Sequence, residues 1–278
     1  MKTQAELLGH HPATPNIFGV WLSCNDVPVT IDKSHRALTQ LIKTTDKQLI
    51  DWLGSKIFEH HHSEYRVQKL KENFTKLGFE KYAEQNRKLP TADRTRKGNA
   101  TEVILSEYIE SALGKKLIKA FKLKYNPNAD QAIKGDDTLL IDVIDNKKSK
   151  RIKLYLGEAK FRKTPSSKVI KDISKSLSKD KKPLSYSFMV DELGRDAKTK
   201  DLADLLDTFI IDEVKGKGDL IYTGFLLSNL DTFNVVEAHL KSDNPLFVLI
   251  SIGIDAPEEL INKAFEKAEY LFANPDQV

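Results

Sequence analysis

The stretch GDDTLLIDVIDNKKSKRIKLYLGEAKFRK, residues 135–163, predicts a β-hairpin with charged side chains at its open end. Residues 138–144 and 152–157 are rich in Leu and Ile, as strands are, and the polar DNKKSK between them is typical of a turn. Acidic residues precede the first strand, and Glu158 and Lys160 close the second. The hairpin therefore brings acids and a lysine to one place.

The register of the hairpin decides which carboxylate meets Glu158. If residues 146–149 form the loop, Asp137 falls opposite Glu158, with Cβ atoms about 4.5–5.5 Å apart, and Lys160 points the same way. A loop one residue longer or shorter puts Asp136 in the place of Asp137. The other residues of this face are apolar: Leu139, Ile141, Val143, Ile152, Leu154 and Leu156. Charges at the end of such a face need a partner or a metal ion.

A helix predicted over residues 99–113 supplies a third carboxylate. Glu102 shares an i, i+3, i+7 stripe with Leu105 and Ile109, which predicts a buried position, whereas Glu107 is expected to be exposed. Three carboxylates suit Mg²⁺, which prefers oxygen ligands, and Mn²⁺ is an alternative. Such a metal polarises a phosphoryl oxygen and lowers the pKa of a bound water. The lysine could orient that water or stabilise the developing charge.

The pattern acid-x-Lys carries little weight by itself. With 40 acidic residues in this chain, roughly five chance matches are expected. The match at Glu158 and Lys160 differs because it ends an apolar strand and follows an aligned aspartate. The alternative is an ion pair that only stabilises the edge of the sheet.

Basic residues are concentrated directly after this motif. Between residues 160 and 182 only Asp172 and Asp180 oppose nine basic side chains: Lys160, Arg162, Lys163, Lys168, Lys171, Lys175, Lys179, Lys181 and Lys182. A second cluster holds Arg87, Lys88, Arg94, Arg96 and Lys97. Such clusters neutralise nucleic-acid phosphates, although a solvated helix face has the same composition. The residues expected to contact a nucleic-acid backbone are Arg162, Lys163, Lys168, Lys171 and Lys175.

The rest of the chain predicts a mixed α/β or α+β order. Strands are expected within residues 17–22 and at 185–190, 220–227 and 246–254. Helices are expected from residue 32 through Leu77, after Pro165, and over 201–214 and 258–272, with a linker at 87–97. Three consecutive histidines, His60, His61 and His62, point about 100° apart on a helix, so they predict a polar helix end rather than a metal site.

Composition excludes several classes of protein. The net charge is +4 over 278 residues, and Cys24 is the single cysteine, so no intrachain disulfide forms. The start MKTQAELLGHH lacks an apolar signal region, and the longest apolar stretch is far shorter than the ~20 residues of a membrane helix. We expect a soluble, cytoplasmic protein.

Three segments carry a family resemblance. KGNATEVILSEYIE (97–110), KGDDTLL (134–140) and LYLGEAKFRK (154–163) resemble the PD-(D/E)xK nucleases, and more narrowly the HamA nuclease subunits of bacterial Hachiman anti-phage systems. The chain departs from the superfamily motif at one point: the motif has a proline before the aspartate, and no proline precedes the aspartate pair here.

The resemblance implies a restriction-endonuclease-like α/β fold, with a mixed central sheet flanked by helices. It implies a nuclease domain over residues 91–278, with 1–90 as a mostly helical appendage that packs on it or docks a partner. Glu102, Asp137 (or Asp136) and Glu158 would bind Mg²⁺, and Lys160 would be the catalytic lysine. The implied substrate is DNA. The implied partner is a superfamily-2 helicase subunit, HamB, which restrains the nuclease. The chain itself has no GxxxxGK[ST] phosphate loop.

Two competing functions remain open at this point. One is a non-catalytic nucleic-acid-binding or regulatory module on a nuclease-like fold. The other is a sequence-specific restriction or repair endonuclease, which would give discrete cleavage bands rather than smears.

Overall fold

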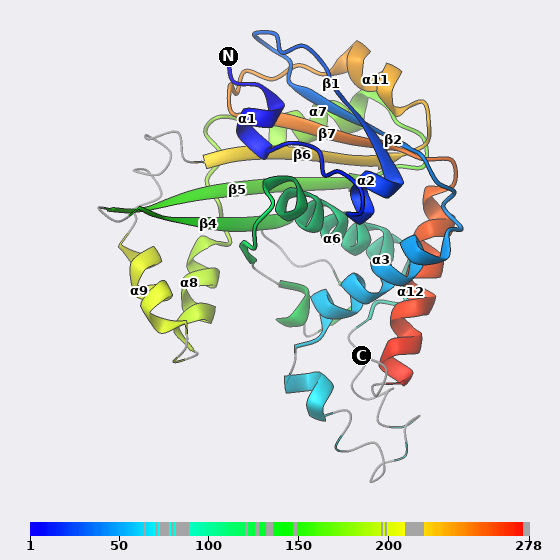
Figure 1. Ribbon diagram of the computed structural model, residues 1–278, viewed down its shortest axis with the longest axis vertical. Coiled ribbons are helices and arrows are strands. Elements are labelled where there is room, and N and C mark those ends of the chain that lie inside the picture. The colour runs from blue at the N-terminus through cyan, green and yellow to red at the C-terminus, as the bar shows by residue number, and fades with distance from the viewer. Residues whose placement is uncertain are drawn as a thin grey trace.

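A computed structural model of the chain describes residues 1–63, 65–69, 72, 78, 81, 89–119, 122–125, 128–131, 136–146, 149–195, 197, 199–208 and 220–274. A twisted seven-stranded sheet runs through the centre of the molecule in the order β1-β2-β7-β6-β5-β4-β3 (Figure 1). β2, β7, β6 and β5 are parallel to one another, and β1, β4 and β3 pair antiparallel at the two sides. The strands are β1 (Leu22–Asp26), β2 (His35–Gln40), β3 (Ile118–Lys119), β4 (Thr138–Asn146), β5 (Ser149–Phe161), β6 (Leu220–Ser228) and β7 (Phe247–Gly253). The predicted mixed α/β sheet is thus confirmed.

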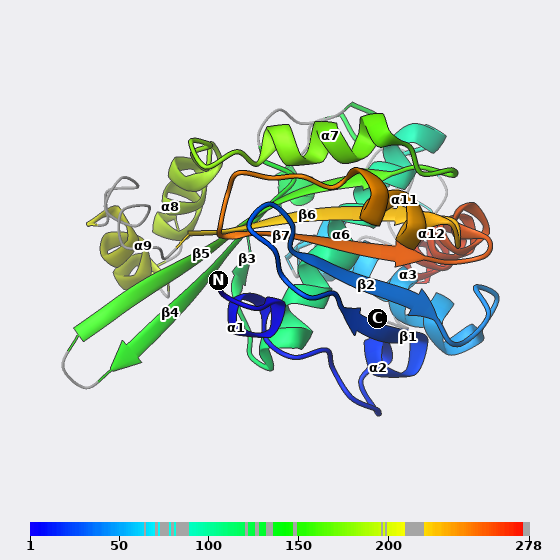
Figure 2. The same ribbon diagram turned by 90° about the horizontal axis from the view of Figure 1, so that it is seen from above.

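Helices cover both faces of the sheet, as Figure 2 shows. One face packs against α3, α6 and α12, and the other against α7, α8, α9 and α11. The helices are α1 (Gln4–Leu8), α2 (Ile17–Trp21), α3 (Lys47–His61), α6 (Asp93–Leu113), η1 (Lys122–Tyr125), α7 (Ser167–Ser176), α8 (Tyr186–Gly194), α9 (Lys200–Asp207), α11 (Thr232–His239) and α12 (Pro257–Ala273). Because both faces are covered, every residue of β6 and β7 is buried. In the part of the chain that the structure describes, no helix is long and apolar enough to cross a membrane.

The hairpin of β4 and β5 has the predicted register. The ladder runs from Thr138 opposite Gly157 to Asn146 opposite Ser149, so the next residues outward are Asp137 and Glu158. Asn146 and Ser149 themselves pair, so both belong to the strands and not to the predicted loop. Because each strand gains one residue of the predicted loop, the pairing of all other residues is unchanged.

β5 extends beyond the point where β4 begins. Residues 158–161 pair with β6 on one side, and the ladder with β4 ends at Gly157. At Ala159 the side chain of Asp137 takes the role of a strand partner, because its Oδ2 accepts the backbone N–H of Ala159 at 2.9 Å. We call this open end of the hairpin the notch.

Gly157 lets α6 approach the hairpin closely. A Cβ atom built on Gly157 would lie 2.7 Å from the Cδ2 of Leu105, far inside van der Waals contact. Leu105 lies about one turn after Glu102 on α6. The helix that carries Glu102 therefore packs directly on the strand that carries Glu158.

Several predicted elements are wrong, for reasons that lie in their surroundings. The expected helix from residue 32 is instead the strand β2, which lies between β1 and β7. The expected strand at 185–190 is the start of α8, where Tyr186 and Met189 share a buried helical face. The strand expected within 17–22 is the short helix α2 followed by β1, and α6 begins at Asp93, inside the expected linker.

The region before residue 90 is continuous with the rest of the sheet. β1 and β2 extend the sheet, and α3 packs against α12 from the other end of the chain. The helix expected to include Val67, Leu70, Phe74 and Leu77 is described only in part: residues 65–69 are helical, and the other three named residues lie outside the described part. A domain boundary near residue 90 stays a prediction, and among the described residues the two sides share one core.

Candidate active site

The notch gathers three of the predicted site residues. The Nζ atom of Lys160 forms an ion pair with Oε1 of Glu158 and lies 3.6 Å from Oδ2 of Asp137. The side chain of Lys160 is 32% exposed, and those of Asp137 and Glu158 are each 19% exposed. One cation thus sits between two carboxylates that remain accessible from outside.

The charge of Lys160 depends on these two carboxylates. Burial alone would lower the pKa of Lys160, but Asp137 and Glu158 reverse that effect and raise the pKa above its ordinary value. Lys160 is therefore a fixed positive charge at neutral pH.

Glu102, on α6, faces the same cleft as two residues of the notch. It lines a cleft of about 860 Å³ together with Asp137 and Lys160. The remaining lining residues include Asp93, Arg94, Thr95, Lys97, Gly98, Asn99, Leu123, Asp130, Gln131, Ala159, Phe161, Arg162 and Lys163. The predicted residues from α6 and from the hairpin thus meet at one cleft, although Glu158 reaches it through Lys160 rather than as part of its wall.

The donor set suits a divalent cation in part. Asp137 and Glu158 are close enough to share one cation, since the ammonium of Lys160 contacts both. Within the described ranges, no three His, Cys, Asp or Glu side chains are grouped closely enough to hold a metal by themselves. Mg²⁺ is commonly held by one or two carboxylates with waters and substrate phosphates, so the pair fits that cation.

Asp136, the alternative to Asp137, is engaged elsewhere. Its side chain is buried, and its Oδ2 accepts the backbone N–H of Ser185 at 2.9 Å, directly before α8. Lys181 lies 3.7 Å from its other oxygen. Asp136 is absent from the cleft wall and ties α8 to the hairpin, so the geometry favours Asp137 as the carboxylate of the site.

The basic residues divide into two groups. Arg162 and Lys163 line the cleft, whereas Lys168, Lys171 and Lys175 lie exposed on α7, whose buried side packs on the opposite face of the sheet. Two further cations, Arg94 and Lys97, line the cleft from the first turns of α6. They belong to the second basic cluster of the sequence, which was the signal that could have placed them here.

With the geometry in view, two comparisons with known proteins decide the family. The family model HamA matches residues 15–268, which include the N-terminal strands as well as the notch. The chain is also 34% identical over 277 residues to the Hachiman protein HamA of Bacillus cereus, covering 97% of this chain and 96% of that protein. The chain belongs to the HamA family. HamA proteins are anti-phage defence proteins of the Hachiman type.

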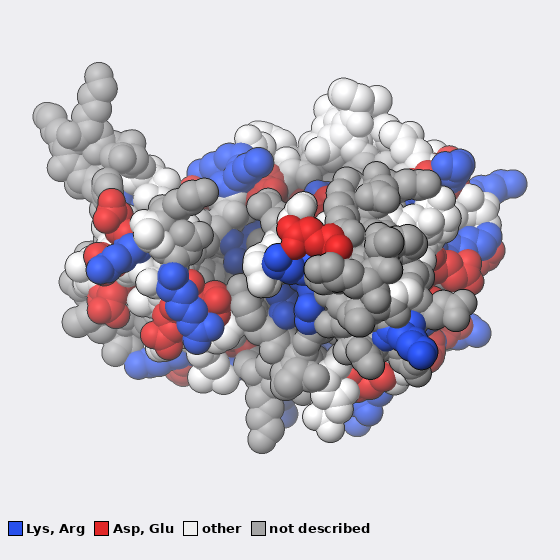
Figure 3. Space-filling view, turned by 90° about the horizontal axis from the view of Figure 1, so that it is seen from below, with Lys and Arg blue, Asp and Glu red and all other residues white. Residues whose placement is uncertain are grey.

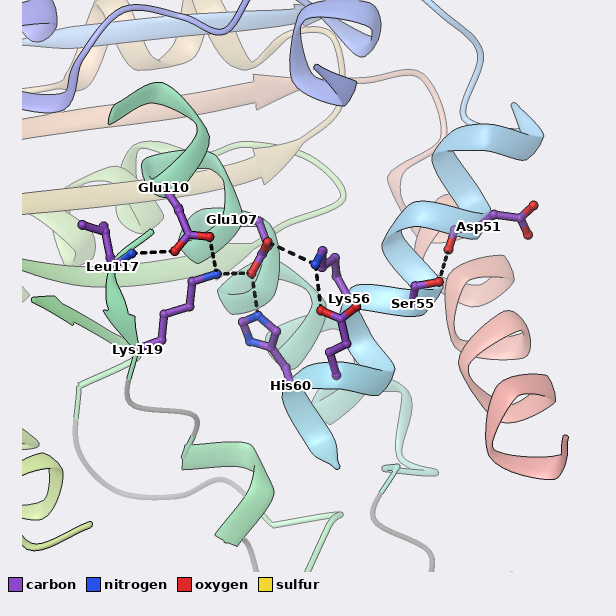
Figure 4. A network of polar contacts seen from close by, with 9 residues as sticks. Asp51, Ser55, Lys56, His60, Glu107, Glu110, Leu117 and Lys119 are labelled. Carbon is purple, nitrogen blue, oxygen red and sulfur yellow. Dashed lines mark hydrogen bonds and ion pairs between the residues drawn. The ribbon is translucent and has the colours of Figure 1, made fainter. Parts of the chain in front are cut away.

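This HamA family member contains a second charged cluster that the sequence did not reveal, the buried network (His60, Glu107 and Lys119; Figure 4). Glu107 was expected to be exposed, but its Oε1 accepts from Nε2 of His60 at 2.8 Å and pairs with Lys119. The prediction is wrong because α3 and β3 cover the side of α6 on which Glu107 lies. Although burial opposes it, His60 and Lys119 lower the pKa of Glu107 to about 2.

The three consecutive histidines end a helix, as predicted, but all are buried. His61 donates from Nδ1 to the carbonyl of Ile57 at 2.7 Å, and His62 donates from Nδ1 to the carbonyl of Phe58 at 3.1 Å. Each ring has its own partner in the helix or on α6, so the three do not converge on one point.

One face of this HamA family member carries charges of both signs. On the face drawn in Figure 3, the coloured basic and acidic side chains lie interspersed rather than as one basic field. This agrees with the small net charge of +4.

Proposed function

We propose that this HamA family member is a Mg²⁺-dependent nuclease that hydrolyses DNA phosphodiesters as an effector of anti-phage defence. The observation that carries the proposal is the notch, where the ammonium of Lys160 lies between the carboxylates of Asp137 and Glu158. The same cleft is lined by Glu102 and by basic side chains. This combination of acids, lysine and neighbouring cations is suited to a phosphate ester.

Each residue has a proposed role. Asp137 and Glu158 would hold the cation, and Glu102 would complete its surroundings from α6. When bound, a divalent cation polarises the phosphoryl oxygen and lowers the pKa of a water at the site. Lys160 would orient the attacking water or stabilise negative charge on the phosphate, because it stays protonated beside two carboxylates. Mn²⁺ would serve as an alternative cation.

The cations of the cleft would hold the DNA backbone. Arg94, Arg162 and Lys163 line the cleft and would contact phosphates, which carry no information about sequence. We therefore propose cleavage with little sequence preference. Lys168, Lys171 and Lys175 would extend this contact outside the cleft.

The family resemblance supports a partner as well. We propose that a superfamily-2 helicase subunit, HamB, restrains the nuclease until it engages aberrant DNA. Residues 1–90 are the proposed docking region.

One observation favours a second function, a non-catalytic nucleic-acid-binding module. The described residues contain no group of three side chains that is ready to ligate a metal. A nuclease fold that had lost catalysis could keep the cations of the cleft and bind nucleic acid without turnover.

A cleavage assay separates the two functions. Plasmid DNA is incubated with the full chain and Mg²⁺, alone and with the helicase subunit and ATP. Lys160→Ala is compared with wild type, and Lys47→Ala is the control because it removes an ion-paired lysine of α3 that does not line the cleft. We expect wild type and Lys47→Ala to degrade the plasmid and Lys160→Ala to lose about 10³-fold in rate.

The outcomes are distinct. Equal degradation by wild type and Lys160→Ala would show that the site lies elsewhere. No degradation in any condition, with Mg²⁺ or Mn²⁺, together with retained DNA binding would establish the non-catalytic module. Discrete bands in place of a smear would contradict the proposed lack of sequence preference.

A further inference from the structure

A single carboxylate bridges two lysines beside the cleft. Oε1 of Glu258 lies 2.6 Å from Nζ of Lys97, and its Oε2 lies 3.2 Å from Nζ of Lys163. The three residues come from three separate elements: Lys97 from the start of α6, Lys163 from the segment after β5, and Glu258 from the start of α12. Each carboxylate oxygen thus accepts from a different part of the chain.

The position of this bridge links two hollows. Lys97 and Lys163 line the cleft that contains Glu102 and Lys160, whereas Lys163 and Glu258 line a second hollow of about 600 Å³. Lys163 is shared by both, and its side chain is 75% exposed. A nucleic-acid strand leaving the cleft toward α12 would meet the two lysines where Glu258 now lies.

The charges at the bridge are those of a phosphate contact. Hydrogen bonds from Lys97 and Lys163 lower the pKa of Glu258, so its carboxylate is ionised at neutral pH. An anion with two oxygens, each accepting from one ammonium, has the charge and donor pattern of a backbone phosphate between two lysines. Lys97 also forms an ion pair with Asp93 at 2.7 Å. Loss of the Glu258 carboxylate would therefore leave Lys97 with a second acidic partner.

We propose that Lys97 and Lys163 form a binding subsite for one backbone phosphate of nucleic acid, and that Glu258 occupies it as an internal phosphate mimic. This inference deepens the proposed function, on which it rests for the class of ligand. Glu258 limits DNA affinity in the resting protein, because a phosphate must displace it from both lysines. Removal of its charge frees the subsite.

The competing explanation is structural. Glu258 could simply join α12 to α6, as Glu269 does where it pairs with Arg96 at 2.6 Å. In that case loss of the carboxylate would lower thermal stability without changing DNA affinity. The two explanations therefore differ in a binding measurement.

The test measures binding of a short fluorescent DNA duplex to the full chain in EDTA, by anisotropy over a range of salt concentrations. Glu258→Gln is compared with Glu259→Gln, which changes the charge equally but removes a carboxylate that pairs with Lys263 on its own helix at 2.7 Å. We expect Glu258→Gln to bind about three- to tenfold more tightly, with a salt slope steeper by about 0.9 for one added phosphate contact. Glu259→Gln should show neither change. Adding Lys163→Ala to Glu258→Gln should return affinity to the wild-type value or below.

Other outcomes overturn the inference. Unchanged affinity in Glu258→Gln, equal tightening in both glutamine variants, or no duplex binding by any variant would each do so. If Glu258→Gln does not fold, Glu258→Asp replaces it, since the shorter side chain keeps the charge but cannot reach both lysines; it should tighten binding to a smaller extent.

A parallel cleavage assay with Mg²⁺ keeps this inference separate from the nuclease proposal. If DNA is cleaved but Glu258→Gln does not bind it more tightly, only the phosphate-mimic proposal is contradicted. If Glu258→Gln binds DNA more tightly but no DNA is cleaved, the subsite is supported and the nuclease proposal is contradicted.

Discussion

The notch and the buried network use the same side chains in opposite ways. Each places a lysine against carboxylates, yet the lysine of the notch is 32% exposed while Lys119 of the buried network is 10% exposed. In the buried network His60 and Lys119 contact Glu107, and Lys56 approaches the same carboxylate at 3.8 Å (Figure 4). In the notch one lysine serves two carboxylates beside an open cleft. The difference in exposure separates the two clusters: a ligand can reach the charges of the notch, whereas protein side chains cover those of the buried network.

The acidic groups respond accordingly. Glu107 has its pKa lowered to about 2 by His60 and Lys119, so it is ionised and saturated by protein partners. Removing one member of such a buried ion-paired cluster destabilises the fold, because the remaining charges lose their partner. We therefore expect substitutions in the notch to affect activity and substitutions in the buried network to affect stability.

The largest expected effect breaks the notch. Asp137→Asn should reduce Mg²⁺-dependent cleavage by about 10³-fold, because it removes a ligand charge. Asp136→Asn is the matched control: it should keep cleavage per folded molecule but lower stability by about 1–2 kcal/mol, since a buried acceptor loses its charge. Cleavage rates and thermal unfolding are measured for both. Activity lost in Asp136→Asn and kept in Asp137→Asn would reverse the assignment of the ligand.

The second effect concerns the buried network. Glu107→Gln should destabilise the protein by roughly 3 kcal/mol at pH 7, since the pKa of Glu107 falls from 4.5 to about 2 on folding. A lowered carboxylate pKa contributes stability that is complete above pH 4.5 and is lost as the pH falls toward 2. The difference from wild type in urea unfolding should therefore shrink over that range.

Glu110→Gln provides a comparison at the second carboxylate that pairs with Lys119. Glu110 pairs with Lys119 at 3.2 Å and is more exposed than Glu107, so its loss should cost less. A difference between wild type and Glu107→Gln that does not change with pH would contradict the role given to its charge.

The smallest effect sharpens the boundary of the cleft. Replacing Lys171 and Lys175 on α7 by alanine should weaken DNA binding by about twofold or less, because exposed lysines outside the cleft make screened contacts. Replacing Arg162 and Lys163, which line the cleft, should weaken it several times more. Anisotropy titrations of the two double variants decide the order. A larger loss from α7 would move the DNA path to that side of the sheet.

Much of the notch could be predicted from the sequence because its signals are local. The alternation of apolar residues in β4 and β5 and their short turn determine the register, and the register brings Asp137 to Glu158. The end of α6 follows from Gly114, whose φ of 64° suits glycine. The start of α7 follows from Ser166, which caps the helix by accepting from the N–H of Val169.

The rest depends on contacts that are distant in sequence. β2 is a strand because His35 pairs with Leu249 of β7, more than two hundred residues later. Glu107 is buried because α3 and β3 cover it, and helical spacing within α6 contains no sign of either element. The bridge at Glu258 likewise needs the start of α12 to meet α6.

Gly157 has no reactive group, yet it affects the geometry of the site through the distance between α6 and β5. A Cβ atom at residue 157 would meet Leu105 of α6 at 2.7 Å, so any other residue there would hold the helix of Glu102 further from the strand of Glu158. The missing Cβ of Gly157 thus sets how closely α6, which carries Glu102, packs on β5, which carries Glu158. In this family member the spacing between α6 and β5 therefore depends on a side chain that is absent.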